Sequence, residues 1–178
     1  MPSIAIPEAD NANVLALSRS LVADQQPIYV KHQALSGKPL KECFSIVTQQ
    51  VAEHGGQEVF GWALLELTGI WLEAEFHAVW QLPDGSWLDV TPRQFIPREV
   101  LFLPDPNRRH EGVQIASKFH PLTSHPAVLR HIQLAREFFV ETNKGELAFA
   151  SSYTVTPKIA QIQAEMQYLL PLFPWPYE

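Results

Sequence analysis

The stretch WLEAEFHAVWQLPDGSWLDVTP, residues 71–92, decides the fold. Apolar side chains recur in it with a period of two, which predicts β-strands and not a helix. We expect one strand over Trp71 to Leu82 and a second over Ser86 to Thr91, joined by Pro83-Asp84-Gly85. This tripeptide is typical of a three-residue hairpin loop in which glycine takes the left-handed position. The stretch therefore predicts an antiparallel hairpin.

The two faces of the first strand differ in character. One face is apolar throughout and belongs to the core; it consists of Leu72, Ala74, Phe76, Ala78 and Trp80. The opposite face carries Glu73, Glu75 and His77, because side chains in a strand alternate between the two faces. We therefore expect His77 to project from a partly charged face and not from the core face.

The loop length decides whether Asp89 can reach His77. With a three-residue loop, His77 pairs with Thr91, and Asp89 lies on the same face as His77, displaced by two residues. Diagonal neighbours of this kind are roughly 7–8 Å apart, within reach of an imidazole and a carboxylate. A two-residue turn at Asp84-Gly85 would shift the register by one and place Asp89 opposite Trp80, on the wrong face.

Outside this hairpin, the pattern predicts helices and strands along the rest of the chain. Pro39 suits the first turn of a helix and Gly55-Gly56 suits its end, so a helix is expected from about Leu40 to His54. The other expected segments are a helix over 10–23 capped by Asp10, an extended segment over 27–30, strands over 58–67 and 99–103, an irregular stretch over 104–120, and helices over 125–141 and 157–170 capped by Ser124 and Thr156. This order predicts an α+β fold with a helix packed on an antiparallel sheet.

Cys43 is the only cysteine of the chain, and it falls about one turn into the expected helix. A helix N-terminus carries partial positive charge, which favours the reactive thiolate. Buried free cysteines often only fill space, so Cys43 alone is a weak signal. An imidazole can act as the base of a thiol, and a carboxylate can orient that imidazole. Cys43, His77 and Asp89 together therefore form a candidate nucleophile, base and orienting group.

A cysteine at a helix start, followed by HAVW (residues 77–80) and WLDVTP (residues 87–92), resembles the core of the transglutaminase-like superfamily. That group belongs to the wider papain-like clan. The resemblance covers about residues 38–92. It implies a papain-like or transglutaminase-like core, in which an N-terminal catalytic helix packs on an antiparallel sheet and additional helices follow at the C-terminus. It also implies that Cys43 is the nucleophile, His77 the general base and acid, and Asp89 the orienting residue.

Three further residues are candidates for substrate binding. Gln33 precedes the cysteine by ten residues and is a candidate second donor to an oxyanion, as a glutamine upstream is in papain-like enzymes. Trp62 is a candidate cleft wall, although tryptophans are more often core residues. Glu75, with Glu73, favours a cationic or amine-bearing substrate. The alternative for Glu73, Glu75 and His77 is a metal site completed by ligands from elsewhere.

Composition excludes several classes of function. With 46% apolar and 18% charged residues, the chain is neither a disordered tail nor a membrane protein. The net charge is −6 and the only basic cluster is Arg108-Arg109-His110, which argues against nucleic acid as the main partner. The N-terminal segment lacks a basic region followed by an apolar one, so we expect no signal peptide and a cytoplasmic location.

The sequence thus predicts one domain over 1–178, with a catalytic core at about 27–103 and a helical part at about 124–178. We expect a thiol-dependent enzyme without cofactor or metal, acting on a peptide, protein or amide substrate as a peptidase, amidase, deamidase or transamidase. The alternative is a non-catalytic binding module on a degenerate papain-like scaffold. The oligomeric state has no signal in the sequence.

Overall fold

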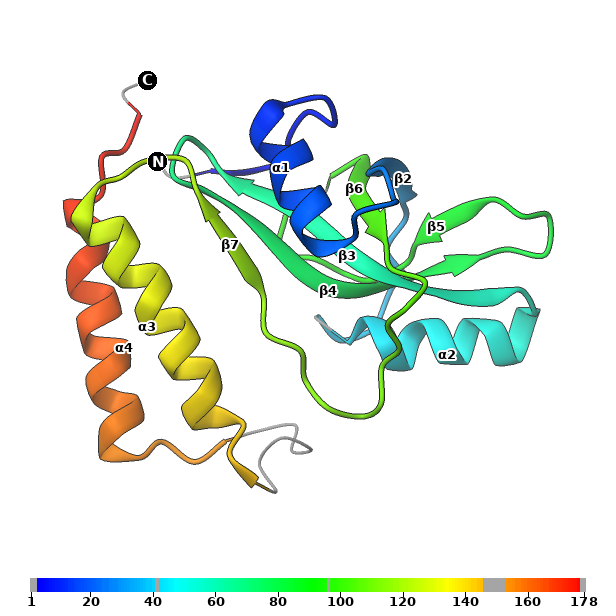
Figure 1. The fold of residues 1–178 in the computed structure, drawn as a ribbon. Helices are drawn as coiled ribbons and strands as arrows, with labels where there is room; N and C mark the ends of the chain where they lie inside the picture. Colours follow the sequence, from blue (N-terminus) through cyan, green and yellow to red (C-terminus); the bar gives the residue numbers. More distant parts are fainter. Residues whose placement is uncertain (1–2, 41, 96, 146–152, 177–178) are drawn as a thin grey trace.

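Two long antiparallel strands, β3 (Gln57–Leu67) and β4 (Trp71–Gln81), form the centre of the fold (Figure 1). The structure is a computed structural model, and it describes residues 3–40, 42–95, 97–145 and 153–176. The remaining strands are β1 (Ile4–Ala5), β2 (Ile28–His32), β5 (Trp87–Asp89), β6 (Glu99–Pro104) and β7 (Lys118–Pro121). The helices are α1 (Ala12–Leu21), α2 (Cys43–His54), α3 (Pro126–Thr142) and α4 (Pro157–Leu169), followed by a 3-10 turn over Leu170–Leu172.

Five of the strands close into a barrel. Their order is β3-β6-β2-β5-β4, and β4 pairs again with β3, while β1 and β7 extend the sheet outside this ring. An α+β fold was expected and is present, but the sheet differs from the expected antiparallel one. Strand β2 runs parallel to β5, because the other four pairings of this five-strand ring are antiparallel and an odd ring cannot alternate in direction throughout. A papain-like core remains a prediction.

The face of β4 that carries His77 and Val79 points into the barrel, whereas the face that carries Phe76 and Ala78 points outward. Val79 packs there with Val30, Val100 and Phe102, which come from β2 and β6. His77 shares this face and is only 2% exposed. The expectation that this face lies away from the core is therefore wrong at His77. Alternation identified the face correctly, but closure of the sheet covers it.

Helix α2 packs on the outer face of the barrel. Its residues Ile46 and Val47 are buried against Ala78 and Trp80 of β4. The helix begins at Cys43, and Pro39 and Leu40 lie outside it, so Cys43 is the first helical residue and does not lie one turn inside. The Trp80 indole donates a hydrogen bond to the carbonyl of Gly55 at the helix end, which fixes the helix against the strand.

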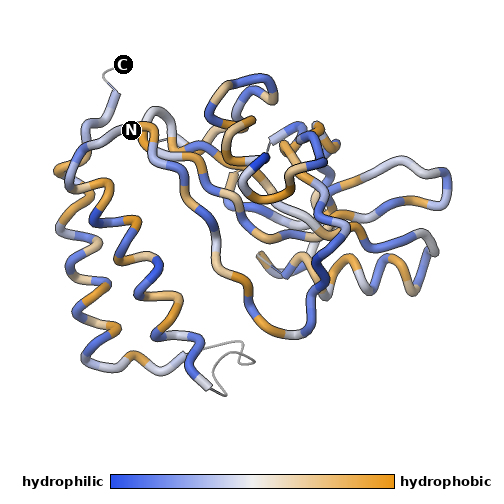
Figure 2. The backbone as a smooth tube through the Cα atoms, in the orientation of Figure 1, coloured by the Kyte–Doolittle hydropathy of each residue, from blue (hydrophilic) through white to orange (hydrophobic). Residues whose placement is uncertain are grey.

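Helices α3 and α4 lie side by side, and α3 is the one that lies next to β7 (Figure 1). Along both helices apolar and polar residues alternate, as Figure 2 shows, which is typical of helices with one covered face. Their apolar residues form one core cluster with Ile70 and Trp71 at the β3–β4 turn. Thr156 caps α4 as expected, since its hydroxyl accepts a hydrogen bond from the amide of Ile159. In the described residues, no helix is both long and apolar enough to span a bilayer.

Two other expectations need correction. The stretch 104–120 was expected to be irregular, but it contains the start of β7, which pairs with β4. The caps expected at Asp10 and Ser124 lie one residue later, at Asn11 and His125. In both cases a residue next to the expected one begins the helix, a difference that sequence patterns do not resolve.

Candidate active site

The hairpin between β4 and β5 has the three-residue loop on which the site prediction depends. The amide of Leu82 donates to the carbonyl of Ser86, and Gly85 has a φ of 87°. Trp80 pairs with Leu88, so Asp89 alternates onto the same face as His77. His77 Nε2 lies 3.1 Å from Asp89 Oδ1. The expected proximity of the two residues is confirmed; their catalytic roles stay a prediction.

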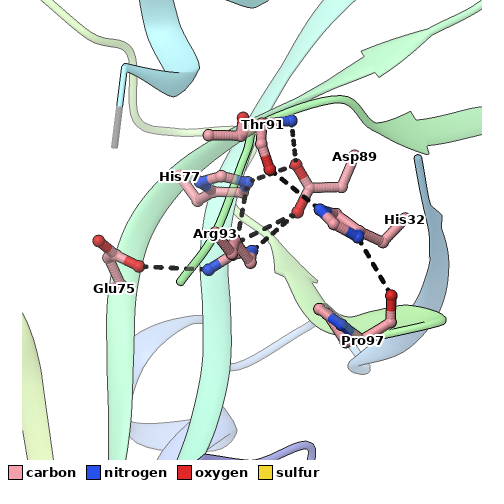
Figure 3. Close-up of polar contacts among 7 residues, drawn as sticks. All are labelled: His32, Glu75, His77, Asp89, Thr91, Arg93 and Pro97. Atoms are coloured by element: carbon pink, nitrogen blue, oxygen red, sulfur yellow. Dashed lines mark hydrogen bonds and ion pairs between the residues drawn. The ribbon is translucent and has the colours of Figure 1, made fainter. Parts of the chain in front are cut away.

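The Asp89 side chain is fully buried, and His77, Thr91 and Arg93 contact its carboxylate (Figure 3). Besides His77, Oδ1 accepts a hydrogen bond from the amide of Thr91, an aspartate turn that fixes the carboxylate to its own backbone. Oδ2 accepts two hydrogen bonds from Arg93, from Nε at 3.2 Å and from Nη2 at 3.1 Å. A buried carboxylate is tolerated only when it is paired in this way.

Arg93 connects three ionisable side chains of the site, as Figure 3 shows. Its Nη2 lies 3.1 Å from Asp89 and 3.2 Å from His77 Nε2, and its Nη1 lies 3.6 Å from Glu75 Oε2. The Arg93 side chain is 8% exposed, and that of Glu75 is 36% exposed. The guanidinium therefore lies between the buried pair and a carboxylate in contact with solvent.

The pKa values of the buried pair move in opposite directions. Burial alone would lower the pKa of His77, but attraction to Asp89 and to Cys43 outweighs it and raises this pKa to about 10. Burial alone would raise the pKa of Asp89, but His77 and Arg93 shift it well below its usual range. Both shifts favour the ionic form of the pair, an imidazolium beside a carboxylate.

Cys43 and His77 line one cavity of about 170 Å³. Cys43 contributes from the start of α2, His77 from β4, and the segment Thr91–Phe95 from the loop after β5. The other lining residues are Ile4, Leu40, Leu65, Glu73 and Glu75. The cysteine itself is 5% exposed. The cavity thus brings a thiol and a paired imidazole to the same space.

The three expected substrate-binding residues have different positions. Glu75 lines the cavity, as expected. Trp62 does not line it: this side chain is 1% exposed, and its indole donates a hydrogen bond to the buried Asp105. Gln33 is exposed and does not line it either, but its backbone N–H donates to the backbone carbonyl of Asp89 at 2.9 Å and so fixes the end of β5. A cleft-wall role for Trp62 is therefore wrong in this structure.

The alternative of a metal site at Glu73, Glu75 and His77 has no geometric support. Within the described ranges, no group of three or more His, Cys, Asp or Glu side chains is arranged to bind a metal ion. The reason is that His77 contacts Asp89 and Arg93, and Glu75 lies beside Arg93.

Sequence reasoning missed Arg93 and His32. Arg93 follows Asp89 by four residues in an irregular loop, where sequence spacing predicts no contact. His32, buried at the end of β2, has its two ring nitrogens 3.1 Å from the Pro97 carbonyl and 2.9 Å from the Thr91 carbonyl. It thereby connects both ends of the loop that carries Arg93. The parallel pairing of β2 with β5 brings it there, and no local pattern indicates that pairing.

Comparisons with protein-family models, with curated proteins and with solved structures gave no match.

Proposed function

We propose that this protein is a thiol-dependent acyl-transfer enzyme, with Cys43 as nucleophile, His77 as base and acid, and Asp89 as orienting group. The observation that carries the proposal is the cavity lined by Cys43 and by a His77 whose Nε2 lies 3.1 Å from Asp89 Oδ1. The sequence resemblance to the transglutaminase-like superfamily supports the same assignment.

The position of Asp89 assigns the two nitrogens of His77. Asp89 and Arg93 both contact Nε2, so exchange of a proton with Cys43 uses Nδ1. The Cys43 side chain is one of the groups that raise the pKa of His77. The same electrostatic attraction between Cys43 and His77 favours a thiolate beside an imidazolium. The thiolate is the reactive form of cysteine.

In the first half of the reaction, the Cys43 thiolate attacks the carbonyl carbon of an amide or ester. A carbon–sulfur bond forms, and the carbonyl oxygen becomes an oxyanion. Cys43 is the first residue of α2, and the Glu42 side chain does not cap the first turn, so the Cys43 amide can donate to that oxyanion. The bond to the leaving group then breaks, and His77 Nδ1–H protonates the departing amine or alcohol.

In the second half, water or an amine attacks the thioester carbonyl. His77 Nδ1 takes the proton of the attacking group, the carbon–sulfur bond breaks, and the thiolate leaves. The products are an acid or a new amide, and Cys43 and His77 return to their starting state. Asp89 accepts from Nε2–H in both halves and stabilises the imidazolium.

The size and charge of the cavity restrict the substrate. About 170 Å³ is below the roughly 300–1,000 Å³ of sites that enclose a drug-sized molecule, so only a small part of the substrate enters. The charge argument for a cationic substrate is weaker than the sequence suggested, because Arg93 lies near Glu75 and offsets part of its charge. We propose a peptide, protein or small amide whose scissile group alone reaches Cys43.

The test is the rate at which iodoacetamide alkylates Cys43 at pH 6, compared with free cysteine. We expect faster alkylation in the native protein, and loss of that advantage in His77→Ala. The matched control is His54→Ala, an exposed histidine on α2 that should leave the rate unchanged. Alkylation of the native protein no faster than that of free cysteine contradicts the enzyme and favours a binding module. If alkylation is fast and depends on His77, profiling with electrophilic amide and peptide probes would identify the acyl group of the substrate.

A further inference from the structure

The Arg93 guanidinium is placed where it can act on two members of the candidate site at once. It donates twice to Asp89 Oδ2, and its Nη2 lies 3.2 Å from His77 Nε2. At 8% exposure this charge is poorly screened by water, so its effect on its neighbours is larger than that of a surface arginine. Arginine suits such a position because its planar fork stays charged and donates in fixed directions.

We propose that Arg93 is a positioning residue: it fixes the Asp89 carboxylate toward His77 and, through its charge, limits how tightly His77 retains its proton. The inference rests on the proposed function for its catalytic meaning. A histidine paired only with a buried carboxylate would bind its proton strongly and protonate a leaving group poorly. A neighbouring cation repels the imidazolium and so lowers the affinity of the histidine for its proton.

The contacts of Nε2 support this division of roles. Nε2 cannot donate to Asp89 and accept from Arg93 in the same protonation state, since arginine is a donor only. When His77 is an imidazolium, Nε2–H donates to Asp89, and Arg93 adds repulsion. Among the residues that the structure describes, the ionisable groups that contact His77 or line its cavity are Cys43 on α2, Asp89 at the end of β5, Arg93 in the following loop, and Glu73 and Glu75 on β4. Among these, Arg93 is the only permanent cation.

Glu75 provides the way to vary this effect without touching Arg93. Its carboxylate lies 3.6 Å from Arg93 Nη1 and is partly exposed, so its charge offsets part of the guanidinium charge. Neutralising Glu75 should therefore increase the effect of Arg93 on His77. A group bound in the cavity beside Glu75 would act on His77 by the same route.

The experiment is an NMR titration of the His77 ring in a Cys43→Ser background, where the cysteine no longer contributes and no turnover is needed. We expect Arg93→Gln to raise the pKa of His77 by about one unit or more. Arg93→Lys retains the charge and should shift the pKa clearly less. An unchanged pKa in Arg93→Gln, or equal shifts in both variants, overturns the proposal, since a purely structural arginine would give either result.

Arg93→Met fills a similar space without charge and decides the matter if Arg93→Gln does not fold; an unchanged pKa of His77 in it overturns the proposal. Glu75→Gln is a further measurement with an expected lower pKa of His77, to which loss of the Glu75 charge itself also contributes; an unchanged or higher pKa overturns the proposal. Failure here is distinguishable from failure of the proposed function. Slow alkylation of Cys43 in the wild-type protein would refute the enzyme, whereas the His77 titration tests Arg93 alone.

Discussion

Gly61 lies directly opposite His77 in the ladder between β3 and β4. A Cβ atom at Gly61 would lie 2.2 Å from the Leu103 carbonyl oxygen and 2.7 Å from the Phe102 ring. Both residues belong to β6, which pairs with β3 at this point. The absence of a side chain at Gly61 therefore allows β6 to approach β3 closely and close the barrel behind His77.

Gly61→Ala should consequently destabilise the barrel. A methyl group here meets backbone, which cannot move aside as a flexible side chain can, so the strands must separate. We expect a loss of about 1–3 kcal/mol in the free energy of unfolding, the usual range for overpacking. Urea denaturation measures it. The control is Gly112→Asn, at an exposed glycine with a φ of 78° that asparagine tolerates and with nothing within 4 Å of the added Cβ. Equal stability of Gly61→Ala and wild type would contradict the close approach.

His32→Leu should also destabilise the protein, for a different reason. The substitution puts an apolar side chain of similar size in place of the ring and removes both contacts to the Thr91 and Pro97 carbonyls. Leaving buried carbonyls without a donor costs about 1–3 kcal/mol. Urea denaturation against His54→Leu, an exposed position, isolates the effect. If the two variants are equally stable, the ring contacts do not contribute to fixing the loop that carries Arg93.

The hairpin was predictable because its signals are local. Pro83-Asp84-Gly85 fixes the loop, the loop fixes the register, and the register places Asp89 beside His77. Each step depends on residues close together in the chain, where turn chemistry and side-chain alternation act directly. The cap at Thr156 was predictable for the same reason.

The closed barrel was not predictable, because it depends on pairings between distant segments. β2 joins β5 and β6, and β3 joins β6, through hydrogen bonds that no local pattern specifies. Closure buries the face that carries His77, and alternation cannot distinguish a buried polar residue from a solvated one. The position of Arg93 follows from the loop that closes this region, so its contacts appear only in three dimensions.

Asp89→Asn should reduce the reactivity of Cys43. The amide cannot stabilise an imidazolium, and its NH₂ group can favour the wrong tautomer of His77. We expect the rate of Cys43 alkylation at pH 6 to fall by about 10- to 300-fold, because a thiol with the usual pKa of about 8.5 still has about 0.3% thiolate at this pH. The pKa of His77, followed by NMR, should fall as well. Asp105→Asn is a suitable comparison, because Asp105 is also buried and hydrogen-bonded but contacts Trp62. A rate in Asp89→Asn equal to that of wild type would remove Asp89 from the site.

The ionic pair also predicts how stability depends on pH. The pKa of His77 is raised to about 10 in the folded protein, whereas a histidine in an unfolded chain titrates near about 6.5. The folded state therefore binds this proton more tightly. Its contribution to stability is complete below about pH 6.5 and is lost as the pH rises towards 10. The pKa of Asp89 is lowered, so its contribution is present above about pH 4 and is lost as the pH falls.

The difference in unfolding free energy between wild type and His77→Gln should therefore be largest between about pH 4 and pH 6.5 and should shrink from pH 6.5 to 9.5. Urea denaturation at pH 5.5, 7.0, 8.5 and 9.5 measures this difference directly. His54→Gln corrects for the general effect of losing a histidine, because His54 is exposed on α2 and lies beside Glu53 and the Trp80 ring. A difference that stays constant or grows with pH over this range would mean that His77 is neutral in the folded protein. Asp89 would then be paired by Arg93 alone, and the thiolate–imidazolium pair on which the proposed reaction depends would not form.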